Sequence, residues 1–171
     1  MSSPRCSFPL GNGRFIQVKE WQGELRVDIR EWEGDVPTKK GISLNLMQFK
    51  NFLNGMSSAI EPVMKNKRAE QDEKFHLGAG VYITVTKDNP CVDIRKYWMN
   101  PPNQDESLPT KKGICLRPTE YDTLIKSRCK VKDLLPELKD EIPCYMNEDH
   151  QNQEGMLRCK MCNPDDYKNW L

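Results

Sequence analysis

Val27-Asp28-Ile29-Arg30 is a short string, but it decides the fold together with Pro37-Thr38-Lys39-Lys40-Gly41-Ile42, because both strings return further along the chain. The first recurs at residues 92–95 and the second at residues 109–114, in the same order. The offsets are 65 and 72 residues, so the later copy carries a longer loop between its strings. A unit of this length that occurs only twice predicts two tandem copies of one small domain rather than a repeat array.

Each copy predicts a β-hairpin, a further strand and then a helix. In the first copy, residues 15–21 and 25–30 alternate apolar and polar side chains around a turn, which is typical of a hairpin. A short strand around residues 41–44 follows, and Asn45 can then cap a helix. Pro62 is expected to end or kink that helix. Its apolar positions recur at helical spacing: Leu46, Phe49, Leu53 and Met56.

The second copy repeats this order. Strands are expected at residues 81–85, 91–97 and 113–116, followed by a helix with Pro118 in its first turn. The resulting division is a first domain at residues 11–64, a charged linker or helix extension at 65–75, a second domain at 76–138 and an acidic Cys/His-rich tail at 139–171.

Composition excludes several classes of protein. The formal net charge of the 171 residues is +1, with a mildly basic body and an acidic tail. The chain holds no apolar run near the roughly 20 residues that span a bilayer, and its first residues lack the apolar core of a signal peptide. A cytosolic or nuclear location is expected. Seven cysteines, an odd and mostly scattered set, favour reduced thiols over a secreted disulfide framework.

Strand alternation sorts the side chains of the first copy onto two faces. The helix must cover the apolar face, which carries Ile16, Val18, Leu25, Val27, Ile29, Ile42 and Leu44. The opposite face carries Phe15, Gln17, Lys19, Trp21, Arg26, Asp28, Arg30 and Trp32. A single-stranded nucleic acid requires such a surface, because cations follow its phosphates and rings stack on its unpaired bases.

Two alternatives remain open for this face. Alternating charge on the open side of an antiparallel sheet commonly serves only solvation, and Trp32 could equally pack against the following loop. Against the first alternative, the cationic pair Lys39-Lys40 returns as Lys111-Lys112, each time just before a glycine that lets the backbone come close to a neighbour. Asp28 and Asp93 each precede an arginine by two positions and are expected to form structural ion pairs.

The duplicated strings also resemble a known family. Asp28-Ile29-Arg30-Glu31-Trp32 followed by Lys40-Gly41-Ile42-Ser43-Leu44-Asn45 is similar to the DNA-binding domain of the positive cofactor four family of transcriptional coactivators. The second copy matches the same pattern with Asp93-Ile94-Arg95-Lys96-Tyr97-Trp98-Met99 and Lys112-Gly113-Ile114-Cys115-Leu116. Together the two copies cover about residues 11–138.

This resemblance implies an α+β fold in which a curved four-stranded antiparallel sheet precedes a long helix, with homodimers formed through the helices. It also implies a nuclear protein that binds single-stranded or melted DNA and acts with the RNA polymerase II machinery, without a required cofactor. The nucleic-acid-binding residues expected from the resemblance and from alternation are Lys19, Trp21, Arg26, Arg30, Trp32, Lys39, Lys40, Lys87, Arg95, Trp98, Lys111 and Lys112.

The two copies depart from the family pattern in different places. The first has a shortened loop, and Glu24 stands where a lysine is expected. The second has a shorter hairpin without the stacking aromatic, and Lys87 is an uncertain replacement for the cation. Each copy therefore resembles a partial site, one with Trp21 and the other with Trp98. We expect the copies to pair within one chain as a pseudo-dimer that unites the two halves, with a homodimer as the alternative.

The tail carries a second kind of chemistry. Cys144, His150, Cys159 and Cys162 follow one another with the spacing C-x5-H-x8-C-x2-C. Two thiolates from one tight turn and a more distant Cys/His pair could complete a tetrahedral zinc site, which would give this polar segment a reason to fold. The alternative is a disordered acidic tail with incidental cysteines. A redox Cys-x-x-Cys is disfavoured, because no βαβ pattern surrounds it.

Competing functions follow from the same residues. A protein-interaction scaffold with weakened nucleic-acid binding is one alternative, and an RNA-binding regulator is another. An enzyme finds little support, since the sequence shows no carboxylate cluster for a divalent metal, no nucleophile elbow and no phosphate-binding loop.

Overall fold

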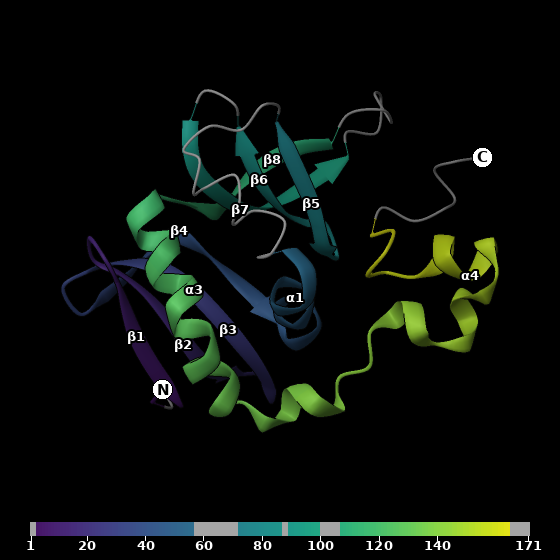
Figure 1. The fold of residues 1–171 in the computed structure, drawn as a ribbon, viewed down its shortest axis with the longest axis horizontal. Coiled ribbons are helices and arrows are strands. Elements are labelled where there is room, and N and C mark those ends of the chain that lie inside the picture. Colours follow the sequence, from purple (N-terminus) through teal and green to yellow (C-terminus); the bar gives the residue numbers. More distant parts are fainter. Residues whose placement is uncertain (1–2, 57–71, 87–88, 100–106, 165–171) are drawn as a thin grey trace.

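The computed structural model describes residues 3–56, 72–86, 89–99 and 107–164. Within them the chain forms two antiparallel sheets of four strands, each followed by a helix (Figure 1). The first sheet contains β1 (Cys6–Gly11), β2 (Arg14–Trp21), β3 (Glu24–Glu33) and β4 (Val36–Asn45) in that order. The second contains β5 (Glu73–Gly78), β6 (Val81–Thr86), β7 (Asn89–Met99) and β8 (Ser107–Leu116) in the same order. The expected duplication and fold class are confirmed.

Register in the first sheet follows the alternation of the sequence. Ile16 pairs with Ile29, Val18 with Val27, and Ile29 with Ile42, so that these side chains share one face. Each of them is at most 5% exposed. A shift of one residue would turn this apolar row to the solvent, which is why the register is well specified.

The edge strands extend beyond the domain boundaries expected from the sequence. β1 lies almost wholly before residue 11, and β5 occupies residues 73–75 of the expected linker. Both strands have a weak sequence signal, because β1 contains Pro9 and β5 begins in a charged stretch. An edge strand tolerates proline, since one side of its backbone has no partner strand. Residues 65–71 of the expected linker and Pro62 lie outside the described residues.

Both expected helix starts are confirmed. Asn45 precedes α1 (Leu46–Asn51), where its side chain accepts a hydrogen bond of 2.8 Å from the Gln48 amide and the Gln48 side chain accepts one from the Asn45 amide. The chain continues as a π-helical turn at Phe52–Met56. In the second copy, Pro118 is the first residue of α3 (Pro118–Asp133).

The helices do not simply cover their own sheets. α3 follows the second sheet in sequence but crosses the face of the first, where it contacts β1 and β2 as well as β7 and β8 (Figure 1). α1 likewise contacts β5 of the second copy in addition to β3 and β4. The buried residues of both copies form one core, which includes Ile16 and Phe49 from the first copy and Ile83 and Leu124 from the second. The two copies are thus joined within one chain through a shared apolar interior.

The tail runs from α3 past α1 as short turns, and α4 (Gln153–Arg158) follows. The segment that follows α3 contacts the start of the chain, where Arg5 and Glu137 form an ion pair with an N–O distance of 2.8 Å. Lys50 on α1 donates a hydrogen bond of 2.8 Å to the Leu138 carbonyl. None of the helices in the described part of the chain has both the length and the apolar character needed to cross a membrane.

Candidate nucleic-acid interface and metal centre

The open face of the first sheet carries the residues expected there. Lys19 pairs with Arg26 across β2 and β3, and Phe15 pairs with Arg30. Lys19 Nζ lies 3.6 Å from the Asp28 carboxylate, and Arg26 lies 3.5 Å from Glu24. Glu24, which stands at an expected lysine position, therefore draws one cation of this face into an ion pair.

An arginine in each copy is held by the aspartate two residues before it. Arg30 donates to both carboxylate oxygens of Asp28 at 3.1 Å and to the Thr38 carbonyl at 2.8 Å. Arg95 contacts Asp93 and the Thr110 carbonyl in the same way. The expected structural ion pairs are confirmed. Because three donor groups of each guanidinium already have acceptors, these arginines are better suited to shape the surface than to act as free phosphate ligands.

The duplicated glycine allows a close approach by the neighbouring strand in each copy. Gly41 pairs with Arg30 across β3 and β4, and an added Cβ would come within 2.8 Å of the Arg30 side chain and the Ile29 carbonyl oxygen. Gly113 stands in the same relation to Arg95, at 2.7 Å. In each copy the glycine therefore makes room for the bound arginine.

The lysine pairs remain exposed on the surface. Lys39, Lys40, Lys111 and Lys112 are all exposed, on β4 and β8. None of the hydrogen bonds or ion pairs within the described part of the chain uses one of these four ammonium groups. They are therefore available to phosphates. Lys87 lies outside the described residues.

Two tryptophans are open to the solvent, and a third is packed. Trp21 is 60% exposed at the end of β2, and Trp98 is 46% exposed near the end of β7. Trp32 instead meets Phe15 edge to face, with 6.4 Å between ring centroids, and its indole nitrogen is buried. The packing alternative for Trp32 is therefore favoured, which leaves one open indole ring in each copy.

The second copy has an aromatic cluster that the sequence reasoning missed. Tyr82 stacks on His76 at 4.6 Å and meets Tyr97 edge to face at 5.3 Å, while Lys74 Nζ lies 4.4 and 4.1 Å from the two tyrosine ring centroids. His76 has a partner too, because its Nε2 accepts a hydrogen bond of 3.0 Å from the Gly80 amide. Burial, then Lys74 and Lys96, lowers the pKa of His76. Alternation along β5 and β6 was the signal that could have found this cluster.

The reciprocal contacts between the copies carry different chemistry. At one junction Arg14 lies 3.1 Å from the fully buried Glu120 and 3.3 Å from Glu31, and its guanidinium also donates to the Cys115 carbonyl. Asn12 donates to Glu120 at 3.2 Å. At the other junction, the Gln48 side chain donates to the Gly78 carbonyl at 2.8 Å. The first, which we call the closed junction, thus holds a buried ion network. The second, the open junction, holds a neutral amide contact.

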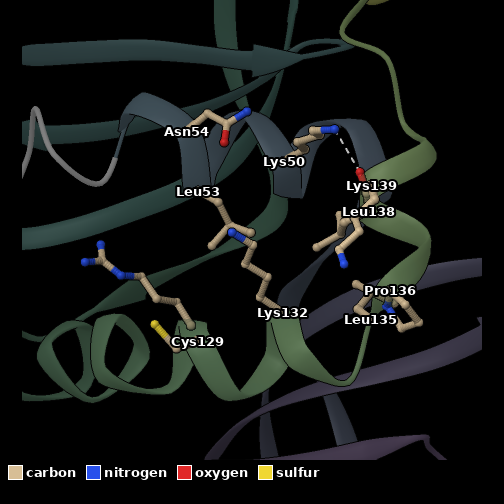
Figure 2. A pocket seen from close by; sticks show the side chains of 10 residues that line it. Lys50, Leu53, Asn54, Cys129, Lys132, Leu135, Pro136, Leu138 and Lys139 are labelled. Carbon is tan, nitrogen blue, oxygen red and sulfur yellow. Dashed lines mark hydrogen bonds between the residues drawn. The ribbon is translucent and has the colours of Figure 1, made fainter.

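A separate groove lies between the helices. Figure 2 shows it between α1 and α3, with Leu53, Leu135 and Leu138 among its apolar lining and Lys132 and Lys139 as cations. Its volume is about 430 Å³. None of the expected nucleic-acid residues lines it, so this groove is distinct from the sheet surface.

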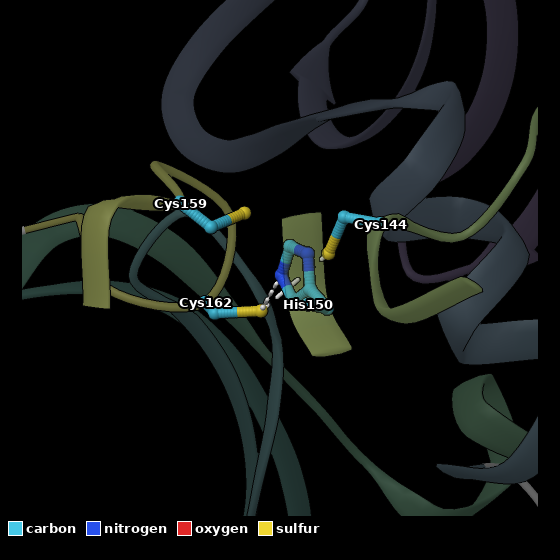
Figure 3. A group of neighbouring side chains, drawn as sticks. All are labelled: Cys144, His150, Cys159 and Cys162. Carbon is cyan, nitrogen blue, oxygen red and sulfur yellow. Dashed lines mark hydrogen bonds between the residues drawn. The ribbon is translucent and has the colours of Figure 1, made fainter. Parts of the chain in front are cut away.

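The four expected metal ligands come together in the tail. The ligand atoms of Cys144, His150, Cys159 and Cys162 all lie within 4.8 Å of one another, which is close enough to hold a metal ion (Figure 3). The Cys144 and Cys162 sulfurs are 3.5 Å apart, and His150 Nε2 lies 3.3 Å from the Cys162 sulfur. Ligands at ordinary zinc distances in a tetrahedron would be separated by about 3.5–3.8 Å. The geometry therefore fits one ion at the centre of the four.

The thiols at this centre are electrostatically distinct. Burial, with the Cys144 and Cys159 sulfurs beside it, raises the pKa of Cys162 to about 12. Burial also raises the pKa of Cys144. Although burial opposes it, the backbone amides of Cys162 and Met161 lower the pKa of Cys159. Amides that point at a sulfur in this way are a common support for a metal-bound thiolate.

The metal centre also contacts the second copy. The carbonyl of Met161, between two of the cysteines, accepts a hydrogen bond of 2.8 Å from the Ala79 amide in the β5–β6 turn. The Met161 side chain packs against Gly78, where an added Cβ would collide with it. The tail is therefore docked on the second copy near the junction at which Gln48 contacts Gly78.

Comparison with known proteins agrees with this architecture. The family model described as Transcriptional Coactivator p15 (PC4) matches the chain twice, at residues 8–55 and 79–127. The two matches together span more than half of the chain; the first covers most of the first sheet and α1, and the second covers β6, β7, β8 and the start of α3. No solved structure matches it. The chain therefore belongs to the transcriptional coactivator p15 (PC4) family and carries its domain in two copies.

Proposed function

We propose that this chain is a non-enzymatic nuclear protein that binds single-stranded or melted DNA and regulates transcription by RNA polymerase II. Membership of the family supports single-stranded DNA binding and transcriptional coactivation. The observation that carries the proposal is the combination of exposed lysine pairs on β4 and β8 with one open indole ring in each copy. Ammonium groups neutralise phosphates, and indole rings stack on bases that are free of a complementary strand.

The surface favours a single strand over a duplex for a physical reason. Base stacking on Trp21 and Trp98 requires an unpaired base with an accessible face, and such stacking contributes about 1–3 kcal/mol per base. Lys39, Lys111 and their neighbours recognise the sugar-phosphate chain, which carries no sequence information by itself. We therefore expect binding with little sequence preference.

Fluorescence anisotropy with single-stranded and duplex oligonucleotides of one sequence, over a salt series, tests this function. We expect tighter binding of the single strand and an affinity that falls linearly with salt on logarithmic axes. An RNA strand of the same sequence distinguishes a DNA-binding protein from an RNA-binding regulator. Weak binding without a salt dependence would instead support a protein-interaction scaffold, an alternative that the ion pairs of Arg26, Arg30 and Arg95 favour.

We further propose that the cluster of Cys144, His150, Cys159 and Cys162 binds zinc. Three thiolates and one imidazole are a common ligand set for structural zinc, and a closed set of four leaves no open position for catalysis. Zinc would provide folding free energy to a segment whose described helices bury no side chain fully.

Elemental analysis of the purified protein measures this directly. We expect about one zinc per chain, with loss of the metal in Cys162→Ser. Cys129→Ser is the matched control, because this exposed cysteine lies on α3 outside the cluster and its loss leaves zinc bound. Protein without metal whose tail still resists proteolysis would overturn the zinc proposal.

A further inference from the structure

We propose that one nucleic-acid strand crosses from the first copy to the second through a single cation-lined groove, so that the chain has one continuous site rather than two equal ones. This inference rests on the single-strand binding proposed above, and it adds the path of the strand. It is carried by the difference between the two junctions, which the duplication alone does not explain.

The groove lies between the two sheets and has a volume of about 620 Å³. Both copies contribute to its walls, and none of the described residues that line it carries a carboxylate. The Arg26 Nε atom is buried and has no hydrogen-bond partner among the described residues. Six cations line it. Arg26 and Arg30 are ion-paired with Glu24 and Asp28, and the four lysines of the lining are Lys39, Lys96, Lys111 and Lys112. A concave site with cations on both walls attracts an extended phosphate chain more strongly than either wall alone.

Each wall of the groove is connected along a strand to one of the open rings. Arg26 pairs with Lys19 across the sheet, and Lys19 is two residues from Trp21 on β2. At the other wall, Lys96 is two residues before Trp98 on β7. A strand that stacks on Trp21 in the first copy and on Trp98 in the second would therefore place its intervening phosphates against the groove.

The counterpart of this groove at the other junction is occupied by protein. Arg14 and Val81 hold the same position in their hairpins, since Arg14 pairs with Gly11 and Val81 with Gly78. Glu31 and Lys96 are also counterparts. Each directly precedes a residue whose amide donates a hydrogen bond to the carbonyl of a glycine in the hairpin turn. Where Val81 and Lys96 leave an open cationic groove, the guanidinium of Arg14 bridges Glu31 and Glu120.

This difference determines where a strand can cross. Glu120 is fully buried and its counterpart Gln48 is neutral, so the closed junction carries two carboxylates that the open junction lacks. Carboxylates at the closed junction repel phosphates, and Arg14 has no free position from which to compensate. The open junction has neither obstacle. The chain is therefore asymmetric in binding although it is nearly symmetric in fold.

A matched pair of lysine variants tests the path. Lys112 and Lys40 occupy the same place in the duplicated string and both are exposed, but only Lys112 lines the groove. With a DNA single strand of about 20 nucleotides, we expect Lys112→Ala to lower the affinity about fivefold or more and to reduce the salt slope by about 0.7. Lys40→Ala removes a phosphate contact outside the groove, so it should lower the affinity by a smaller factor of about two. Lys96→Glu introduces the carboxylate that Glu31 provides at the closed junction, so it should lower the affinity more than Lys112→Ala does. Thermal unfolding shows whether each variant is folded.

The outcomes separate the path from the function. Equal losses in Lys112→Ala and Lys40→Ala, with a wild type that binds single strands, would overturn the crossing path and leave the proposed function intact. A wild type that binds no single strand would overturn both. An RNA strand of the same length shows whether the groove accepts either sugar, because the phosphate contacts are shared by the two.

Discussion

The two copies share a backbone and a set of internal contacts, yet they differ at the surfaces where they meet. Each copy holds an arginine between an aspartate and a threonine carbonyl, and each places an aromatic pair edge to face beside it. At the junctions, however, a buried Arg14–Glu120 pair in one place corresponds to Val81 and Gln48 in the other. These arginine and aromatic contacts within a copy are the same in both copies, whereas the contacts between the copies differ at the two junctions.

This difference shows how a duplication can specialise. In a dimer of identical subunits, any substitution at one junction also occurs at the other. A change that closes one junction by packing would therefore close both. Two copies in one chain are free to make one junction a structural contact and the other a binding groove. In our proposal the closed junction contributes stability and the open junction contributes affinity.

The largest expected effect is at the closed junction. Glu120→Ala leaves Arg14 with only part of its acceptors in a buried site, so we expect the free energy of unfolding to fall by about 3 kcal/mol. Gln48→Ala removes two neutral hydrogen bonds, to the Gly78 carbonyl and from the Asn45 amide, and should cost about 2 kcal/mol. Urea denaturation of both variants makes the comparison. Equal losses would mean that the two junctions are energetically equivalent.

A smaller effect is expected inside the copies, where symmetry is preserved. Gly41→Ala and Gly113→Ala each place a methyl group against the neighbouring arginine side chain and a backbone carbonyl. We expect both to lower the free energy of unfolding by about 1–3 kcal/mol, and by similar amounts. Thermal unfolding provides the measurement. A large effect in one copy alone would show that the arginine contacts have also diverged.

The open rings should affect binding rather than stability. Trp21→Ala and Trp98→Ala remove a stacking surface, so we expect each to lower the affinity for a single strand about tenfold with little change in salt slope. Trp32→Ala is the control, since this ring packs against Phe15 and its loss should reduce stability. Anisotropy and thermal unfolding together separate the two cases, and a Trp32 variant with the greatest loss of affinity would reverse our assignment.

The smallest effect concerns the aromatic cluster of the second copy. The pKa of His76 is lowered from 6.5 in the folded protein, so the unfolded chain binds a proton that the folded chain resists. Above pH 6.5 the imidazole is neutral in both states, so the stability that goes with neutral His76 is fully present. This stability is lost as the pH falls below 6.5, because the unfolded chain then takes up the proton first. His76→Gln keeps an acceptor for the Gly80 amide and should flatten the stability profile in that range. A wild type and variant with parallel profiles would contradict this origin.

Much of the fold could be predicted because the signals are local. Alternation has a period of two, so it identified the buried row around Ile16 and Ile29 and the open face around Lys19. Asn45 and Pro118 marked the helix starts because capping and the proline ring act within one turn. The Cys/His spacing likewise predicted a cluster that the fold brings together.

The remainder depends on contacts between distant residues. Nothing in the sequence of α3 indicates that it crosses the first sheet, since an apolar helix face can cover either one. The role of Val81 at the open junction is recognised only by comparison with Arg14, which contacts Glu120 at the closed junction. The aromatic cluster around Tyr82 was missed because Lys74 was assigned to a linker and no edge strand was expected at His76.

Native mass spectrometry of the chain with a single strand of about 20 nucleotides tests the central claim most directly. The account predicts one strand bound to one chain of 19.9 kDa, with the pairing of the copies retained inside that chain. Two strands bound to one chain, or an obligate dimer of chains in which the copies pair only between molecules, would contradict it.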